Sequence, residues 1–301
     1  MISVLMTTYN EPISLVKESI ESILTQTYTD LELVIIVDNS KNNEILDYLN
    51  NLNDKRVNIL INSKNIGLPL SLNKGIEYAH GNYIARMDAD DVADKSRLEK
   101  QLEYLEKNGL DLVSSNSIDI DEDGKIIGNV TKFPCTTSKI YKYLNFGSSM
   151  FHPTWLGTKE AFEELNGYRN IYSCEDYDFL IRGALKKLKF GNTKDCLLKK
   201  RIRNSSISES SHILQEQTAF LLKKNYRKKK VTSLKEIQTF INGDEFRELR
   251  RKIELSNQLF NEYKNKDGIS RLIFLFKISI NNSMVRKEYI LGKLYRQFLS
   301  L

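Results

Sequence analysis

The sequence contains few cysteine and histidine residues, and this scarcity excludes two kinds of protein. Its three cysteines, Cys135, Cys174 and Cys196, form an odd and widely spaced set without a CxxC pair, and only three histidines accompany them. The pattern argues against a disulfide framework and against a zinc site. We interpret the cysteines as small buried side chains.

Long apolar runs are also absent. No uninterrupted apolar stretch approaches the roughly 18 residues of a membrane-spanning helix, and the opening MISVLMTTYN has no basic segment and too short an apolar run for a secretory signal. We therefore expect a protein that is not integral to the membrane, is located in the cytoplasm and opens on a strand. A length of 301 residues suffices for one large domain and a smaller appendage.

Acidic residues are scarce towards the C-terminus. From His212 onward, 19 Lys and Arg accompany 9 Asp and Glu, whereas residues 1–211 carry a net charge of −4 and the whole chain +6. We predict two regions, a domain over 1–211 and a basic helical region over 212–301. The second is expected to meet an anionic surface.

Apolar runs alternate with amphipathic stretches in the first region. ISVLMT, LELVIIV, VNILI and NYIARMD have the pattern of strands, and LPLSLNKGIEYAH that of a helix. This order predicts an α/β fold with a mainly parallel sheet, which binds ligands at the carboxyl ends of its strands. No GxGxxG follows the first strand; TTYNEP follows instead, with hydroxyl groups, a ring and a carboxylate that suit a base better than a dinucleotide.

The segment ARMDADD places Asp88, Asp90 and Asp91 directly behind a predicted strand. Neighbouring carboxylates raise one another's proton affinity, so a cation between them is expected. A hard divalent ion with oxygen ligands is the obvious candidate. A lone DxD is more often a solvated turn, but the preceding strand and the acids Asp38 and Asp176 favour the metal interpretation.

Six short motifs occur in a characteristic order: TTYN, VDNS, NIGL, ARMDADD, HPT and EDYDF. In them, residues 1–210 resemble the family 2 glycosyltransferases, inverting enzymes with the GT-A fold that use nucleotide-activated sugars. The chain is similar in particular to bacterial enzymes that build capsular, O-antigen and related surface polysaccharides. The resemblance implies a nucleotide-sugar donor, with UDP as carrier, and a glycan acceptor.

The resemblance also implies roles for individual residues. It assigns to the nucleotide base the residues Thr8, Tyr9, Glu11 and Asp38. It places Asn65 and Arg86 near the donor. Asp88 and Asp90 would form the DxD pair beside Asp91, with Asp90 as the direct ligand of Mg²⁺ or Mn²⁺. Asp176 would be the general base, Glu175 would position the acceptor, and His152 would lie on the acceptor or phosphate side.

Each of these residues also has a purely structural interpretation. Glu175 and Asp176 suit a helix N-terminus on account of the macrodipole. His152 could be packed in a loop, Tyr9 could belong to the core, and Asp38 could form a turn.

One position departs from the family: Arg203 stands where many relatives have a histidine that completes the metal site. Arginine cannot ligate a cation, so either the metal keeps an extra water or Arg203 contacts the diphosphate.

The basic region allows three interpretations: a packed subdomain, a membrane-surface helix and a nucleic-acid-binding tail. A helical subdomain packed on the first domain is one interpretation; the other is a helix on a membrane surface, with Phe274, Phe276, Tyr289 and Tyr295 as interfacial aromatics, on the inner face of the cytoplasmic membrane. Such a location would suit an acceptor carried on a lipid diphosphate. Nucleic acid is not expected, because no reading motif accompanies the charge.

Two other functions remain open at this point. A phosphatase-type hydrolase also places DxD after a strand, but it would need neither TTYN nor Asp38. A non-catalytic sugar-nucleotide-binding scaffold would not need Asp88, Asp90 and Asp176 together. The sequence itself does not specify the sugar, the acceptor, the linkage or the oligomeric state.

Overall fold

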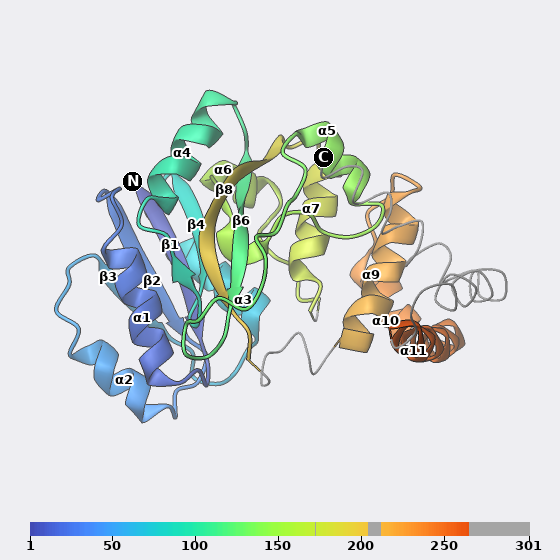
Figure 1. Ribbon diagram of the computed structural model, residues 1–301, viewed down its shortest axis with the longest axis horizontal. Coiled ribbons are helices and arrows are strands. Elements are labelled where there is room, and N and C mark those ends of the chain that lie inside the picture. Colours follow the sequence, from blue (N-terminus) through green and yellow to red (C-terminus); the bar gives the residue numbers. More distant parts are fainter. Residues whose placement is uncertain (172, 204–211, 265–301) are drawn as a thin grey trace.

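One mixed sheet forms the centre of the protein. The computed structural model describes residues 1–171, 173–203 and 212–264 (Figure 1). The sheet has eight strands in the order β3-β2-β1-β4-β7-β6-β8-β5, of which β5 and β7 run antiparallel to their neighbours. The strands are β1 (Ile2–Thr8), β2 (Leu31–Val37), β3 (Val57–Ile61), β4 (Tyr83–Asp88), β5 (Val92–Ala93), β6 (Leu112–Ile120), β7 (Leu156–Thr158) and β8 (Phe190–Arg201). The predicted α/β class with a mainly parallel sheet is confirmed.

Helices cover both faces of this sheet. The helices are α1 (Ile13–Leu24), α2 (Asn43–Asn50), α3 (Leu68–Tyr78), α4 (Arg97–Lys107), α5 (Thr137–Tyr143), the 3-10 turn η1 (His152–Thr154), α6 (Lys159–Glu164), α7 (Glu175–Leu185), α9 (His212–Tyr226), α10 (Leu234–Asn242) and α11 (Asp244–Lys264). Side chains alternate along β1, so Val4 and Met6 join a core with α1, α2 and α4, while Leu5 joins a core with α3, α6 and α7. Continuous apolar strands such as β2 follow from this burial on both faces.

The segment DEDGK forms a turn after β6, but the chain beyond it is not a strand. The backbone N–H of Asp121 donates to the Lys125 carbonyl over 2.9 Å, and Gly124 adopts a φ of +84°, which glycine accommodates without strain. Beyond the turn, a single antiparallel bridge joins Ile120 to Ile126. The chain then runs as an irregular segment to α5.

Helices α9, α10 and α11 pack on the first domain. Leu222, Phe240 and Ile253, one from each helix, are buried in the same core as Phe179 of α7. The Tyr226 hydroxyl also donates to the Tyr141 carbonyl over 3.0 Å. For residues 212–264, the interpretation as a packed helical subdomain therefore describes the structure.

The other interpretation of the basic region concerns residues beyond α11. The proposed interfacial aromatics Phe274, Phe276, Tyr289 and Tyr295 lie outside the described residues. Among the residues that are described, no helix combines the length and the apolar character that crossing a bilayer requires. The boundary at 211/212 stays a prediction.

Candidate active site

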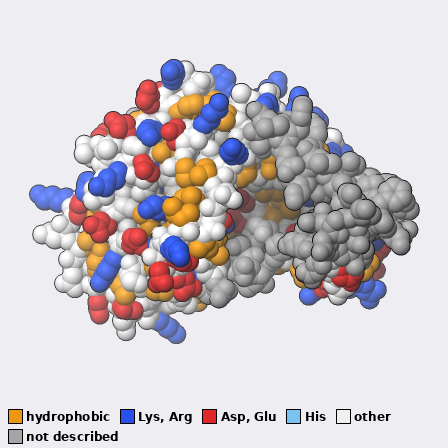
Figure 2. All heavy atoms as spheres, in the orientation of Figure 1, with side chains coloured by type: hydrophobic (Ala, Val, Ile, Leu, Met, Phe, Trp, Pro, Cys, Tyr) orange, Lys and Arg blue, Asp and Glu red, His pale blue; other side chains and the backbone are white. Residues whose placement is uncertain are grey.

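The predicted site residues converge on one edge of the sheet. In the parallel register, Thr8 pairs with Val37, the residue before Asp38, and Thr7 pairs with Asp88. The carboxyl ends of β1, β2 and β4 therefore meet, as in other mainly parallel sheets. Strands β6 and β8 end at the same side, and β8 leads into Arg203. In the space-filling view this face is hollowed beside the sheet domain, with acidic side chains visible in the hollow (Figure 2).

Glu11 organises the loop after β1. One of its carboxylate oxygens accepts hydrogen bonds from the Thr8 hydroxyl over 2.8 Å and from the Tyr9 backbone N–H over 2.7 Å. Thr8 is buried, whereas the Tyr9 side chain is 42% exposed, so the interpretation of Tyr9 as a core residue is wrong. An exposed ring beside a carboxylate and a hydroxyl can stack on a flat ligand.

Asp38 is buried and holds the loop that begins α3. Its Oδ1 accepts from the Asn62 side chain over 2.8 Å and from the Ile66 N–H over 2.9 Å, and its Oδ2 accepts from the Gly67 N–H over 2.8 Å. Gly67 has a φ of +86° and also donates to the Asn65 side chain. Asp38 therefore fixes the NIGL loop, and both of its oxygens already have partners within the chain.

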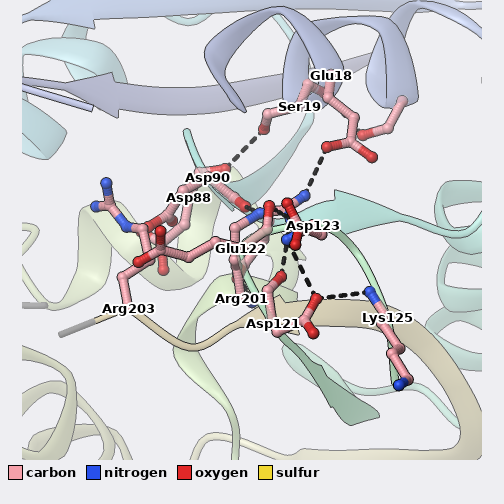
Figure 3. A network of polar contacts seen from close by, with 12 residues as sticks. Glu18, Ser19, Asp88, Asp90, Asp121, Glu122, Asp123, Lys125, Arg201 and Arg203 are labelled. Atoms are coloured by element: carbon pink, nitrogen blue, oxygen red, sulfur yellow. Dashed lines mark hydrogen bonds and ion pairs between the residues drawn. The ribbon is translucent and has the colours of Figure 1, made fainter. Parts of the chain in front are cut away.

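Carboxylates and arginines gather at the end of β4, where Figure 3 shows Asp88 and Asp90 near Arg203 and Arg201. Asp88 forms an ion pair with Arg86. Asp90 Oδ2 lies 2.8 Å from Arg203 Nε, although this N–H is not aligned as a hydrogen bond. Burial and the charge of Asp88 nevertheless raise the pKa of Asp90 to about 6. The guanidinium groups of Arg86 and Arg203 therefore do not fully offset the negative charge of these carboxylates.

Asp91 and Arg201 form the buried part of this cluster. Asp91 Oδ1 accepts from the Arg201 backbone N–H over 2.8 Å, while its buried Oδ2 has no hydrogen-bond partner among the described residues. Burial, followed by the charges of Asp88 and Asp90, raises the pKa of Asp91 well above its ordinary value.

The Arg201 side chain connects four segments. Its guanidinium donates to the carbonyls of Asp90, Asp121 and Glu122 over 2.9, 3.0 and 2.7 Å, and it forms an ion pair with Glu18 of α1 over 2.5 Å. The turn after β6 and the DxD segment are thereby fixed to each other (Figure 3).

A divalent ion fits this cluster in chemistry but not in geometry. Carboxylate oxygens are the ligands that Mg²⁺ and Mn²⁺ prefer. Within residues 1–171, 173–203 and 212–264, however, no group of three or more Asp, Glu, His and Cys side chains is arranged to hold an ion. Asp88 and Asp90 have arginine partners instead. The predicted ligands Asp88, Asp90 and Asp91 therefore do not form a preformed ion site.

The acids Glu175 and Asp176 lie in the first turn of α7. The chain enters this helix through Ser173, whose φ is +56°, and Cys174 is the N-cap without a side-chain capping bond. Burial and then the charge of Asp176 raise the pKa of Glu175 to about 8, and burial raises the pKa of Asp176. A helix N-terminus favours carboxylates, so these raised pKa values show that burial dominates.

Arg86 connects the two acidic groups. Its guanidinium is buried, and its Nε has no hydrogen-bond partner among the described residues. Its positive charge partly opposes the rise in pKa of Asp90 and Asp91, and it does the same for Glu175 and Asp176. Acids that are about 85 residues apart in the sequence thus share one site.

The third acid of α7 has a structural role. Asp178 is 1% exposed and forms ion pairs with Arg169 and, over 2.8 Å, with Arg182. Arg182 also donates to the carbonyls of Leu165 and Gly167 over 2.6 and 2.9 Å. Through these ion pairs, Asp178 holds α7 against the preceding loop.

His152 lies in η1 and is buried. Its Nε2 is 2.9 Å from the Tyr168 hydroxyl, and its ring centroid is 4.6 Å from that of Trp155. Burial, with a smaller effect of Arg86, lowers its pKa well below the ordinary value. A neutral imidazole packed between aromatic rings matches the structural interpretation of this residue.

Sequence reasoning missed Tyr168, Arg201 and Arg97. Arg97 is completely buried behind β4, where it donates to the Arg86 carbonyl over 2.6 Å, and burial lowers its pKa to about 9. Tyr168 contacts His152 and, by its burial, has a raised pKa. No local motif marks these residues, because their roles depend on contacts between distant segments.

Comparisons with known proteins show the family and the fold. The family model described as glycosyl transferase family 2 matches residues 3–165. An uncharacterised glycosyltransferase of Methanocaldococcus jannaschii is 37% identical over 207 residues, covering 68% of this chain and 71% of that protein. The O-antigen biosynthesis glycosyltransferase WbnJ of Escherichia coli is 34% identical over 236 residues, covering 77% and 92%.

Solved structures give the same fold. The crystal structure of S. aureus TarS 1-349 in complex with UDP-GlcNAc aligns with a TM-score of 0.59 at 16% identity, over 73% of this chain and 65% of that one. A mainly parallel sheet with acids at its strand ends defines an α/β protein whose candidate site lies at the carboxyl ends of the strands. The chain belongs to glycosyl transferase family 2, and it is a glycosyltransferase with the GT-A fold.

Proposed function

We propose that this enzyme is an inverting glycosyltransferase that moves a sugar from a UDP-sugar to a hydroxyl group of a glycan acceptor, in the synthesis of a capsular, O-antigen or other surface polysaccharide. The names of two relatives support the pathway: the O-antigen glycosyltransferase WbnJ and the amylovoran biosynthesis glycosyltransferase AmsE of Erwinia amylovora, which is 26% identical over 212 residues. The TarS complex with UDP-GlcNAc supports the class of donor.

One observation carries the proposal: the buried Arg86 guanidinium forms an ion pair with Asp88 of the DxD segment, and its charge also acts on Glu175 and Asp176 of α7. A transferase needs a place for the leaving diphosphate and, across the sugar, a base for the incoming hydroxyl group. The unpaired Nε of Arg86 is a donor for an anionic group.

In the proposed mechanism, Asp176 accepts the proton of the acceptor hydroxyl. The oxygen forms its bond to the anomeric carbon as the bond from that carbon to the diphosphate oxygen breaks on the opposite face, so the configuration inverts. The leaving oxygen takes the bonding electrons, and Arg86 and Arg203 stabilise its charge. Glu175 helps to position the acceptor. The raised pKa of Asp176 suits a base, because it brings the carboxyl group nearer the working pH.

The remaining predicted residues belong to the donor side or to its surroundings. Tyr9 would stack on the base, with Thr8 and Glu11 fixing its loop. Asp38 would act on the donor through the Asn65 loop that it holds. His152 would help to hold the acceptor side of the site in place through its packing, and it would not exchange protons.

A divalent ion enters this proposal only together with the donor. The family commonly uses Mg²⁺ or Mn²⁺, and such an ion would offset the charge of the leaving diphosphate. The donor's phosphate oxygens would have to supply the ligands that the described residues do not offer.

We further propose peripheral attachment to an anionic membrane surface, where a lipid-diphosphate-linked acceptor would be found. The described residues contribute a basic turn after α9, residues 227–230, whose side chains are exposed. Val231 and Leu234 follow it and are 42% and 50% exposed. Cations beside exposed apolar side chains are typical of interfacial contacts.

An assay of nucleotide release tests the proposed function. UDP-sugars are incubated with and without glycan acceptors, and UDP and the transferred sugar are both measured. Release that depends on an acceptor and matches the sugar transferred supports the transferase. Release of free sugar and UDP without any acceptor would instead indicate a hydrolase, and donor binding without turnover would indicate a scaffold.

A further inference from the structure

Asn73 of α3 holds the backbone of Tyr168, which lies 95 positions further along the chain. Its side-chain Oδ1 accepts from the Tyr168 N–H over 2.8 Å, and its Nδ2 donates to the Tyr168 carbonyl over 2.8 Å. One side chain thus pairs with both backbone groups of one residue, as a neighbouring strand would. Tyr168 is buried, so both hydrogen bonds are partly sheltered from water and fix its loop to α3.

Gly167 allows this close approach. A Cβ atom at Gly167 would lie 2.3 Å from Asn73 Oδ1, and the residue also adopts a φ of +64°. Glycine alone meets both conditions without strain. The loop therefore carries the residue that the contact with Asn73 requires.

The same loop is also bound to α7. Arg182 of α7 donates to the carbonyls of Leu165 and Gly167. The centroid of the Tyr168 ring lies 5.2 Å from that of Phe179, which belongs to α7 as well. Because Asn73 holds the backbone of this loop and α7 holds its carbonyls and its ring, the loop connects α3 to α7.

Helices α3 and α7 begin at different parts of the candidate site. Helix α3 follows Gly67, in the loop that Asp38 holds. Helix α7 carries Glu175 and Asp176 in its first turn. Burial raises the pKa of the Tyr168 hydroxyl, and the charges of these two acids act in the same direction, so the ring lies near them. The contact between Asn73 and Tyr168 therefore links the donor loop with the acids of α7.

We propose that Asn73 is a positioning residue for the transfer reaction. By holding Tyr168, it fixes α7, and with it Glu175 and Asp176, relative to α3 and the donor loop. A misplacement of about 1 Å can cost roughly a hundredfold in rate, so two hydrogen bonds that touch no reacting atom affect catalysis. The inference rests on the proposed function for the roles of the two acids.

Hydrogen exchange tests the positioning without any substrate. Amide exchange in residues 165–171 and in α7, residues 175–185, is compared between wild type and Asn73→Ala by mass spectrometry. Loss of both hydrogen bonds should speed up exchange about tenfold in α7 as well as in the loop, because the loop no longer fixes α7 to α3. Faster exchange that is confined to the loop, or no change at all, would overturn the inference.

The products of the reaction give a second readout. With a UDP-sugar and an acceptor that support transfer, the sugar moved to the acceptor and the sugar released to water are both measured. Water depends less on placement than a glycan does, so Asn73→Ala should lower the ratio of transfer to hydrolysis about tenfold. The affinity for UDP, measured by calorimetry, should stay near that of wild type. A purely structural role would lower both rates alike, and an unchanged ratio would therefore contradict the inference.

Asn58→Ala is the matched control. Asn58 of β3 also takes part in two side-chain hydrogen bonds, because it donates to Glu32 over 3.0 Å and accepts from the Tyr78 hydroxyl over 3.1 Å. Its replacement should leave exchange in α7 and the ratio of transfer to hydrolysis unchanged. If this control has the same effects as Asn73→Ala, the effects come from a general loss of stability, and the inference is wrong.

A second variant covers the case in which Asn73→Ala does not fold. Asn73→Asp keeps the size and the acceptor for the Tyr168 N–H, but it places a carboxylate oxygen against the Tyr168 carbonyl. It should cause the same two changes, and wild-type exchange in its α7 would refute the positioning role. Absence of any transfer in wild type would count against the proposed function alone, since the exchange of α7 decides the positioning separately.

Discussion

The backbone N–H of Arg201 donates to Asp91 Oδ1 over 2.8 Å, although the two residues are 110 positions apart. The last residue of β8 thus fixes the last acid of the DxD segment, which follows β4. Arg203 comes two residues after Arg201, so the same strand end also places Arg203 beside Asp90. The acidic cluster is therefore assembled from both halves of the sheet.

Replacing Arg201 by methionine is expected to lower the free energy of unfolding by about 2–4 kcal/mol. The change removes a buried guanidinium and leaves the part-buried carbonyls of Asp90, Asp121 and Glu122 without their donor, which costs free energy. Urea unfolding measures the loss. Arg250→Gln, in an exposed pair with Glu254, should change the stability by less than about 0.5 kcal/mol. A loss below 1 kcal/mol for Arg201→Met would contradict the connecting role.

Asp176→Asn should separate catalysis from binding. Asparagine keeps the shape but cannot accept the acceptor proton, so we expect turnover to fall roughly 10²- to 10⁴-fold while donor affinity stays nearly unchanged. Calorimetry and acceptor-dependent turnover on one preparation measure both. Turnover within a few-fold of wild type, with the fold intact, would mean that Asp176 is not the base. Glu175 would then be the next candidate; Asp178 would not, because two arginines already hold it.

Glu175 should make the protein less stable as the pH rises. Its pKa is about 8 in the folded protein against an ordinary value of 4.5, so the folded state binds more protons than the unfolded state between these values. The free energy of unfolding therefore falls from about pH 4.5 to about pH 8, by an amount on the order of a few kcal/mol, and the loss is complete above pH 8.

The variant Glu175→Gln tests this dependence, because it removes the titrating group and keeps the size. Its melting temperature should exceed that of wild type at pH 8.5 and differ little at pH 4.5. Asp178 lies in the same helix turn but is ion-paired, so Asp178→Asn should instead destabilise the protein at both pH values. A wild-type melting temperature equal to that of Glu175→Gln at pH 8.5 speaks against a buried, protonated Glu175.

The sequence predicted the first four strands, the mainly parallel sheet and the edge at which the site lies, because these follow from apolar periodicity and parallel topology. It could not predict that Asp38 holds its own loop, since the three donors come from Asn62, Ile66 and Gly67. It could not predict the ion pairs of Asp178 either, because an acid near a helix N-terminus gives no sign of its arginine partners. Composition and spacing report local structure, whereas pairing between segments decides which charged groups are available.

The packing of the C-terminal helices changes how membrane attachment must be tested. Truncation near residue 212 would remove Leu222 and Ile253 from the core and expose the surface they cover, so any loss of binding would be confounded by loss of folding. Charge reversal on the surface avoids this problem.

Lys228 and Lys235 flank the exposed Val231 and Leu234, and both lysines are exposed. Each lysine near an anionic bilayer contributes about 1 kcal/mol, so the double variant Lys228→Glu with Lys235→Glu should bind vesicles containing phosphatidylserine more than about tenfold more weakly than wild type. Binding to neutral vesicles should change little.

The control variant Lys55→Glu with Lys107→Glu makes the same change of net charge on the exposed surface of the sheet domain, remote in sequence from this turn. If both double variants lose affinity equally, the attraction is a property of net charge, and the turn after α9 is not the contact. If neither loses affinity, the described residues do not carry the attachment at all.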